Sequence, residues 1–203
     1  MSISVVLFDL GKVLFDFNLS KFTSAFSKKT SRNGEDANKL ISEHRNLAAS
    51  YEIGKITSQE FYESLSESTQ YSGSFNEFSI AWNDIFTPIP DALEILAYTA
   101  AKNKVALLSN TNELHFEYLK ARYPQVFLLF SDFHLSYLMR ERKPDDEIYK
   151  KVIAYYDISP EKIFFTDDLP ENVQAARKNG MKAYQFTSPA DLLQNLKKEN
   201  IEI

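Results

Sequence analysis

The sequence predicts an α/β fold, namely a doubly wound parallel sheet with an inserted α-helical domain. Short apolar runs rich in β-branched residues alternate with segments of helical periodicity through most of the 203 residues. Such alternation is typical of right-handed βαβ units, whose helices cover both faces of a parallel sheet. One long stretch near the N-terminus breaks the alternation and predicts the insertion.

Five apolar segments are candidates for the strands of this sheet. Residues 3–8 are the clearest case, because the run is short, β-branched and apolar on both faces. That pattern is typical of a strand buried in a parallel sheet. The other candidates are residues 104–108, 162–165 and 183–186, and a strand within residues 127–135.

Helical segments lie between these strands and after the last of them. Several begin with proline or an acidic residue, which suit the first turn of a helix, and Gly180 is a candidate C-cap. The predicted helices are residues 91–102, 112–121, 144–156, 170–179 and 189–200.

Residues 18–86 show helical periodicity and no convincing buried strand. We therefore expect a helical domain inserted after the first strand, with residues 87–90 leading back into the sheet domain. The predicted division assigns residues 1–15 and 91–203 to the sheet domain, and residues 16–90 to the inserted domain.

Composition and charge exclude several kinds of function. The net charge is −5 and no basic stripe is present, so we expect no binding to nucleic acid. The absence of cysteine excludes disulfides, thiolate catalysis and cysteine-held zinc. The N-terminal segment lacks the pattern of a signal peptide, and no stretch is long enough to cross a membrane. We therefore expect a cytoplasmic protein, as a monomer or homodimer.

The first two candidate functional segments follow predicted strands, at the sheet edge where open α/β folds bind ligands. Asp9 directly follows the first strand, where a carboxylate is well placed to attack phosphorus. A turn or N-cap aspartate is an equal alternative. Ser109 and Asn110 follow a later strand, where a hydroxyl and backbone N–H groups can hold phosphate oxygens. Capping of the next helix is the simpler alternative.

The other two segments are a lysine and a pair of carboxylates. Lys143 stands before Pro144 and a predicted helix, where an ammonium group can neutralise phosphate charge, although a surface lysine is commoner. Asp167 and Asp168 follow an apolar strand, where adjacent carboxylates repel each other. A bound cation removes this conflict, and Mg²⁺ prefers oxygen ligands. An exposed acidic turn is the alternative.

In their order, these segments resemble the motifs of the haloacid dehalogenase (HAD) superfamily over essentially the whole chain, including a helical cap after the first strand. The resemblance is to the glucose-1-phosphate phosphatase-like branch. It implies a Mg²⁺-dependent phosphatase acting on a small phosphate ester, with a sugar phosphate as one candidate. The resemblance implies that Asp9 is the nucleophile and that Lys143 steadies it. It also implies that the metal ligands are Asp9, the Gly11 carbonyl, Asp167 and Asp168. The groups that would hold the phosphoryl group are Ser109, Asn110 and Lys143.

Gly11 departs from the pattern of this superfamily. Its phosphatases usually carry a second aspartate there, which protonates the leaving group and then activates water. One explanation is a good leaving group, or a substitute acid such as Asp16 or a cap residue. A second is a haloacid dehalogenase, whose halide leaves without a proton. Those enzymes need no metal, and the Asp167–Asp168 pair weighs against them. A third is a catalytically weak phospholigand-binding or regulatory protein.

The predicted cap supplies the candidates for contact with the organic part of a substrate. Residues 51–61 resemble a cap segment of this branch, with Gly54 expected at a turn and Thr57 at a helix start. The candidate pocket residues are His44, Arg45, Trp82 and Asn83, each with a surface or core position as the commoner alternative.

Overall fold

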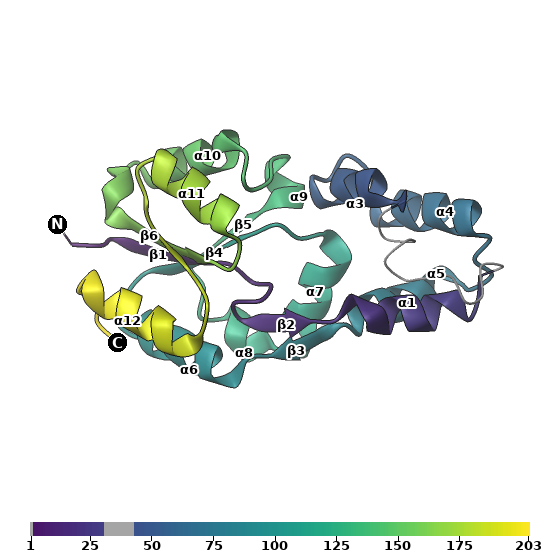
Figure 1. The fold of residues 1–203 in the computed structure, drawn as a ribbon, viewed down its shortest axis with the longest axis horizontal. Helices are drawn as coiled ribbons and strands as arrows, with labels where there is room; N and C mark the ends of the chain where they lie inside the picture. The colour runs from purple at the N-terminus through teal and green to yellow at the C-terminus, as the bar shows by residue number, and fades with distance from the viewer. Residues whose placement is uncertain (1, 31–42) are drawn as a thin grey trace.

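The computed structural model describes residues 2–30 and 43–203, which form a layered α/β body with a helical lobe at one end (Figure 1). The body contains a five-stranded sheet in the order β5-β4-β1-β6-β7, with every pairing parallel. This confirms the predicted fold class. The strands are β1 (Val5–Phe8), β4 (Val105–Ser109), β5 (Asp132–Leu135), β6 (Ile163–Asp167) and β7 (Lys182–Gln185).

Two helical layers cover the two faces of this sheet. Successive side chains of a strand point to opposite faces, so each strand contributes to two apolar cores. In β1, Val6 and Phe8 join one apolar core, whereas Val5 and Leu7 join the other. The first core packs against α6 (Pro90–Ala100), α7 (Glu113–Arg122), α8 (Pro124–Phe127) and α12 (Pro189–Lys198). The second packs against α10 (Asp146–Tyr156) and α11 (Pro170–Lys178); α9 (Ser136–Met139) and the 3₁₀ turn η1 (Pro160–Lys162) complete the body.

The helical lobe has an apolar core of its own. Its helices are α1 (Leu19–Ser27), α3 (Arg45–Glu52), α4 (Ser58–Thr69) and α5 (Phe75–Asn83). Phe22, Phe26, Phe61 and Phe78 are among the buried residues of this core. The separate core supports the predicted division into residues 1–15 with 91–203 and residues 16–90, and we retain that division as a proposal.

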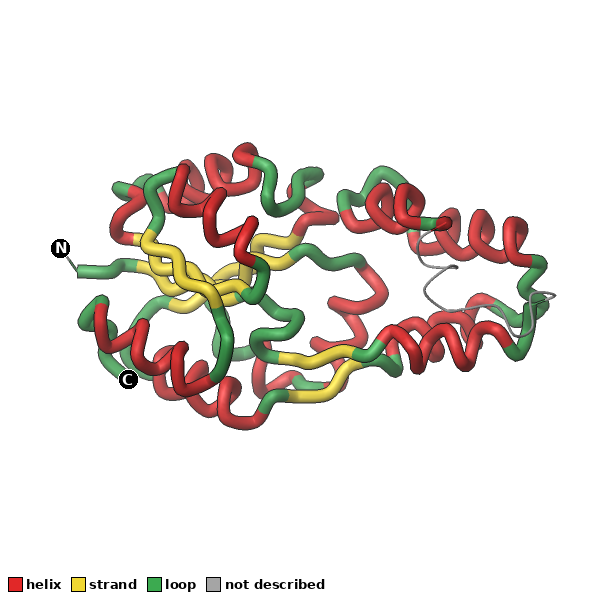
Figure 2. Tube along the Cα trace, in the orientation of Figure 1, coloured by secondary structure: helices red, strands yellow, loops and turns green. Residues whose placement is uncertain are grey.

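A short antiparallel ribbon, which the sequence patterns do not predict, joins the lobe to the body (Figure 2). Strand β2 (Phe15–Phe17) pairs with β3 (Phe86–Pro88), so Phe86 is not part of the helical run, and the segment that leads back into the sheet domain begins in a strand. Each strand is too short to show a periodicity. Their pairing depends on a contact between distant segments, which a local pattern does not reveal.

Among the described residues, no helix has the length and apolar character needed to cross a membrane.

Candidate active site

The four predicted segments meet at the carboxyl edge of the central strands. Asp9 directly follows β1, Ser109 ends β4 and Asp167 ends β6, and β1 lies between β4 and β6 in the sheet. The backbone N–H of Asp9 still donates to the carbonyl of Thr166, at 3.0 Å, so the strand pairing continues up to the carboxylate. The parallel topology therefore brings together residues that are distant in the sequence.

Lys143 links two of the carboxylates in the interior. Its Nζ lies 2.8 Å from Oδ1 of Asp9 and 2.6 Å from Oδ2 of Asp167. It also donates to the carbonyl of Leu108 at 2.9 Å, and the side chain is only 1% exposed. Burial disfavours the ammonium, but the attraction of Asp9 and Asp167 outweighs this, so the pKa of Lys143 is raised. This position excludes the alternative of a solvated surface lysine.

Asp9, Asp167 and Asp168 form the cluster of carboxylates at this edge. One oxygen from each lies within 4.8 Å of the others. Burial raises the pKa of Asp168, and the neighbouring charge of Asp167 adds to the effect. Three carboxylates with one ammonium group leave an excess of negative charge in a poorly hydrated place, which a divalent cation would neutralise. Gly11 stands two residues beyond Asp9, on the wall of the adjoining cavity.

Asn110 fixes the segment that carries Lys143. Its Nδ2 donates to the backbone carbonyl of Lys143 at 2.8 Å, and its Oδ1 accepts from the backbone N–H of Lys143, also at 2.8 Å. This role in fixing Lys143 is additional to the phosphate-holding role that the sequence predicts for Asn110. Ser109 is buried beside it, and within the part of the chain that the structure describes its hydroxyl makes only a 3.5 Å contact with the carbonyl of Asn110. The Ser109 hydroxyl is therefore available to a ligand.

Asn172 has a positioning role that the sequence analysis did not assign. Its Nδ2 donates to Oδ1 of Asp167 at 2.9 Å, and the backbone N–H of Leu169 donates to the same oxygen at 2.9 Å. The hydroxyl of Tyr149 in turn donates to the carbonyl of Asn172 at 2.9 Å. These bonds orient Asp167 so that its other oxygen contacts Lys143. The signal in the sequence was the asparagine in the first turn of α11, five residues after Asp167.

Burial raises the pKa of Asp9 to about 7, and the Lys143 ammonium offsets only part of this shift. A carboxyl whose pKa is higher in the folded state holds more protons there than in the unfolded chain. The free energy of unfolding of the metal-free protein should therefore fall as the pH rises from 3.8 towards about 7. Thermal unfolding in EDTA should show this loss in the parent protein and a smaller loss in Asp9→Asn. Parallel pH profiles for the two proteins would contradict the assignment.

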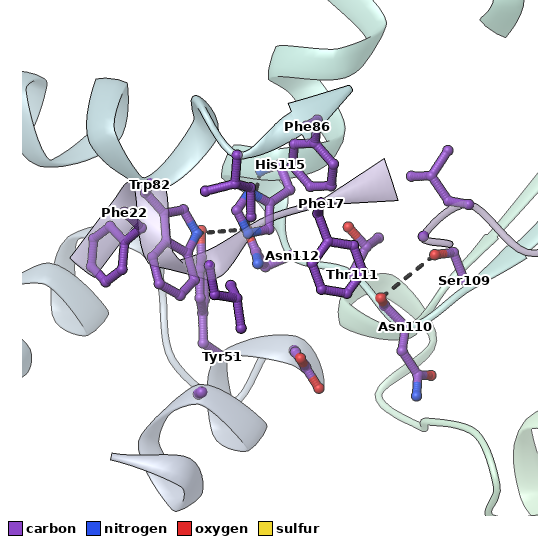
Figure 3. Close-up of a pocket in the computed structure, with 16 residues that line it drawn as sticks. Phe17, Phe22, Tyr51, Trp82, Phe86, Ser109, Asn110, Thr111, Asn112 and His115 are labelled. Carbon is purple, nitrogen blue, oxygen red and sulfur yellow. Dashed lines mark hydrogen bonds between the residues drawn. The ribbon is translucent and has the colours of Figure 1, made fainter. Parts of the chain in front are cut away.

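A cavity of about 300 Å³ extends from this edge towards the lobe. Gly11, Ser109 and Asn110 lie on its wall together with aromatic side chains from the ribbon and the lobe. Figure 3 shows Ser109 and Asn110 at one end, Phe22 and Trp82 at the other, and Phe17 between them. The cavity therefore joins the candidate phosphate-holding groups to an aromatic end.

Trp82 lies on this wall, and the other three predicted pocket residues do not. Asn83 lies behind the wall, where its Oδ1 contacts Nδ1 of His115 at 3.1 Å. His44 contacts the hydroxyl of Ser68 at 2.7 Å, within the lobe, and Arg45 is exposed. The periodicity of the lobe helices did not distinguish the faces directed at the body from those directed at solvent.

Glu52, at the end of α3, is a wall residue that the sequence analysis did not single out. Its Oε2 lies 3.3 Å from a guanidinium nitrogen of Arg142, the residue before Lys143. Burial raises the pKa of Glu52, and Arg142 lowers it in part. The Glu52 carbonyl accepts from the Ser136 hydroxyl at 2.6 Å, which ties the lobe to the body.

Asp16 does not lie on the cavity wall, although it was considered as a substitute acid. Its carboxylate forms an exposed ion pair with Lys12 and accepts the N–H of Phe17. The bond from Lys12 and the bond from Phe17 lower the pKa of Asp16. A carboxyl with a lowered pKa is a poor proton donor near neutral pH.

The ring of Phe17 limits the space beside Gly11. A Cβ atom on Gly11 would lie 3.0 Å from Cε1 of Phe17, closer than ordinary van der Waals contact. We expect Gly11→Ala to lower the free energy of unfolding by roughly 1–3 kcal/mol, as overpacking does. In the Phe17→Leu background the same substitution should cost less, as measured by a double-mutant cycle in urea. Equal costs in both backgrounds would contradict this limit.

The chain belongs to the haloacid dehalogenase-like hydrolase family, which matches residues 3–180. D-ribitol-5-phosphate phosphatase of Bacteroides thetaiotaomicron is 26% identical, over 94% of this chain and 95% of the relative. A HAD family enzyme of the same organism, solved with magnesium and inorganic phosphate, is 29% identical with a TM-score of 0.82, over 91% of this chain and 94% of that one. The predicted family is confirmed.

The fold extends to a HAD-like family hydrolase from Porphyromonas gingivalis. That structure has a TM-score of 0.83 at 22% identity, over 97% of this chain and 99% of the other. The agreement includes the lobe as well as the body, because nearly all of both chains is covered.

Proposed function

We propose that this protein is a magnesium-dependent phosphomonoester hydrolase that acts through an aspartyl-phosphate on Asp9. The observation that carries the proposal is the buried cluster in which Lys143 contacts Asp9 and Asp167 and in which Asp168 completes a set of three carboxylates. The relatives support it, because one is a D-ribitol-5-phosphate phosphatase and another was solved with magnesium and inorganic phosphate.

The described residues fit a magnesium ion. The cluster offers oxygen ligands and an excess of negative charge, and Mg²⁺ binds through few carboxylates and several waters. The proposed ligands are Asp9, Asp167, Asp168 and the backbone carbonyl of Gly11. When bound, the ion would supply positive charge to the phosphate oxygens and allow an anionic ester to approach three carboxylates.

The proposed reaction has two displacements at phosphorus. A carboxylate oxygen of Asp9 forms a bond to phosphorus as the bond from phosphorus to the ester oxygen breaks, and the ester oxygen departs with the bonding electrons as alkoxide or phenolate. Water then attacks the phosphorus of the aspartyl-phosphate, releasing inorganic phosphate and restoring the Asp9 carboxylate. Lys143 and Ser109 would hold the phosphate oxygens, while Asn110 fixes the backbone of Lys143 and offers its own backbone N–H.

The three-carboxylate cluster also distinguishes this proposal from dehalogenation. An aspartate that displaces a halide needs no metal, so it does not require a cluster of three carboxylates to bind one. Their close approach to Asp9 instead favours metal-assisted phosphoryl transfer.

The test is phosphate release from p-nitrophenyl phosphate and a panel of sugar phosphates, in Mg²⁺ and in EDTA. We expect turnover in Mg²⁺, loss in EDTA by at least about 100-fold, and recovery when Mg²⁺ is returned. Full activity in EDTA would contradict the proposal and favour metal-independent chemistry. A folded protein that binds phosphate and releases none from any ester would contradict it in favour of a phospholigand-binding role.

A further inference from the structure

The cavity beside the candidate active site ends in a group of apolar side chains that we call the aromatic chamber: Phe17, Leu19, Phe22, Trp82, Ile85 and Phe86. These side chains come from β2, α1, α5 and β3 and the loop before β3, so the ribbon and the lobe together build the chamber. The rings of Phe22 and Trp82 meet edge to face at 4.8 Å, and those of Phe17 and Phe86 at 6.2 Å. Such walls favour an apolar, flat group over a hydrated one.

The polar atoms around the aromatic chamber are largely engaged within the protein. The Tyr51 hydroxyl contacts the Ser58 hydroxyl at 2.8 Å and accepts the backbone N–H of Leu114 at 3.2 Å. Oδ1 of Asn112 accepts the N–H of His115 at 3.1 Å and Nε1–H of Trp82 at 3.5 Å. A ligand with several hydroxyl groups would leave some of them unpaired on entry, which is costly.

Charge on the wall is compensated. Its described residues include no lysine or arginine, and the carboxylate of Glu52 is paired with Arg142 at 3.3 Å. His115 stacks on Trp82 at 5.0 Å, and burial lowers its pKa to about 3, so its ring is neutral. A second phosphate or a carboxylate on the substrate would find no cation among the described wall residues, which favours an uncharged organic group.

The leaving group is constrained by a separate observation. Gly11 has no side chain that could donate a proton, and the ring of Phe17 lies 3.0 Å from where a Cβ atom would stand. Asp16 and Glu52 are both engaged in ion pairs, with Lys12 and Arg142. A phenol has a pKa of about 10 and departs as phenolate without a proton, whereas an aliphatic alcohol needs one. A site of this kind works best on an ester whose oxygen is attached to an aromatic ring.

We propose that the substrate class is an aryl phosphate, in which an uncharged aromatic ring occupies the aromatic chamber and departs as phenolate. This inference rests on the proposed phosphatase function and narrows it. The sugar or polyol phosphate suggested by family resemblance and by the ribitol-phosphate relative is then a poorer substrate.

Three esters separate the two parts of the inference: phenyl phosphate, cyclohexyl phosphate and D-ribitol 5-phosphate. Cyclohexyl and ribitol phosphates share an aliphatic leaving oxygen and differ in polarity, so their ratio reports on the chamber. Phenyl and cyclohexyl phosphates share a ring of similar size and differ in the leaving group. We expect kcat/KM to fall by about tenfold or more at each step from phenyl to cyclohexyl to ribitol phosphate.

Variants tie these preferences to the chamber. Leu19 is 36% exposed, so Leu19→Asp should remain folded. It should lower kcat/KM for cyclohexyl phosphate by about fivefold or more and leave inhibition by inorganic phosphate unchanged, because the charge is added only at the chamber. Ile80→Asp, on the exposed face of α5, is the matched control and should match the parent protein. Equal loss in both variants would overturn the assignment of the chamber.

Glu52→Gln tests the claim that the leaving group departs without a proton. We expect it to change the rates on phenyl and cyclohexyl phosphates by the same factor. A loss at least about tenfold greater on cyclohexyl phosphate would identify Glu52 as a proton donor and overturn this claim. A higher kcat/KM for ribitol phosphate than for cyclohexyl phosphate would overturn the claim that the aromatic chamber favours an apolar group. It would leave the phosphatase proposal intact. No hydrolysis of any ester by folded, Mg²⁺-loaded protein would instead refute the proposed function itself.

Discussion

Asp9→Asn should lower kcat by at least about 10⁴-fold, because an amide oxygen is far too weak a nucleophile to displace the ester oxygen from phosphorus. The variant should remain folded. The pKa of Asp9 is raised by burial, so the protein holds this carboxylate at a cost, and a neutral amide of the same shape removes that cost. Steady-state kinetics in Mg²⁺ measure the fall in kcat, and circular dichroism shows whether the variant is folded.

Asp16→Asn is the matched control for this substitution. Asp16 follows Asp9 by seven residues, but its exposed carboxylate contacts Lys12 and lies off the cavity wall. An exposed pair of this kind contributes little to stability, so kcat should change by less than about twofold. Near-normal turnover by Asp9→Asn, or a comparable loss in Asp16→Asn, would contradict the assignment of the nucleophile.

Lys143→Met should have the second large effect, on both stability and activity. It leaves Asp9 and Asp167 buried and without the ammonium that lies 2.8 and 2.6 Å from them. Removing one partner of a buried ion pair costs about 3–5 kcal/mol, and loss of a preorganised cation lowers kcat by roughly 10²–10³-fold. Mg²⁺ should restore part of the stability and little of the activity, because the ion neutralises the carboxylates but does not replace the ammonium at the phosphate.

Urea denaturation with and without Mg²⁺, followed by kinetics on the folded fraction, measures these effects. Lys150→Met is the control, because Lys150 forms an exposed pair with Glu147 on the same side of the body, in α10. It should cost less than about 1 kcal/mol. If Lys143→Met changed the stability and kcat no more than Lys150→Met does, the claim that the buried cluster takes part in catalysis would be contradicted.

The sheet and the carboxylate cluster could be predicted from the sequence, because both depend on local patterns. A buried parallel strand needs a short apolar run, and its carboxyl end is marked by the first polar residue, as at Asp9 and Ser109. The topology then places these ends at one edge of the sheet. Lys143 required the family resemblance as well, since a lysine before a helix is commonly exposed.

The ribbon and the cavity wall could not be predicted in the same way. The pairing of Phe17 with Phe86, and the ion pair of Glu52 with Arg142, join segments whose proximity depends on how the lobe meets the body. Neither contact leaves a periodic trace in the sequence. The absence of an acid at residue 11 can be read from the sequence, but the close approach of the Phe17 ring to that residue cannot.

The most direct test of the account is to look for the phosphoryl group on Asp9. The enzyme would be mixed with phenyl phosphate and Mg²⁺, quenched in acid within the first turnover, digested and analysed by mass spectrometry. We expect the peptide that contains Asp9 to carry one phosphoryl group that is labile to base and to hydroxylamine. When EDTA replaces Mg²⁺ in the reaction, this phosphoryl group should not form. Turnover with no phosphoryl group on Asp9, or with one attached to another residue, would contradict the central claim.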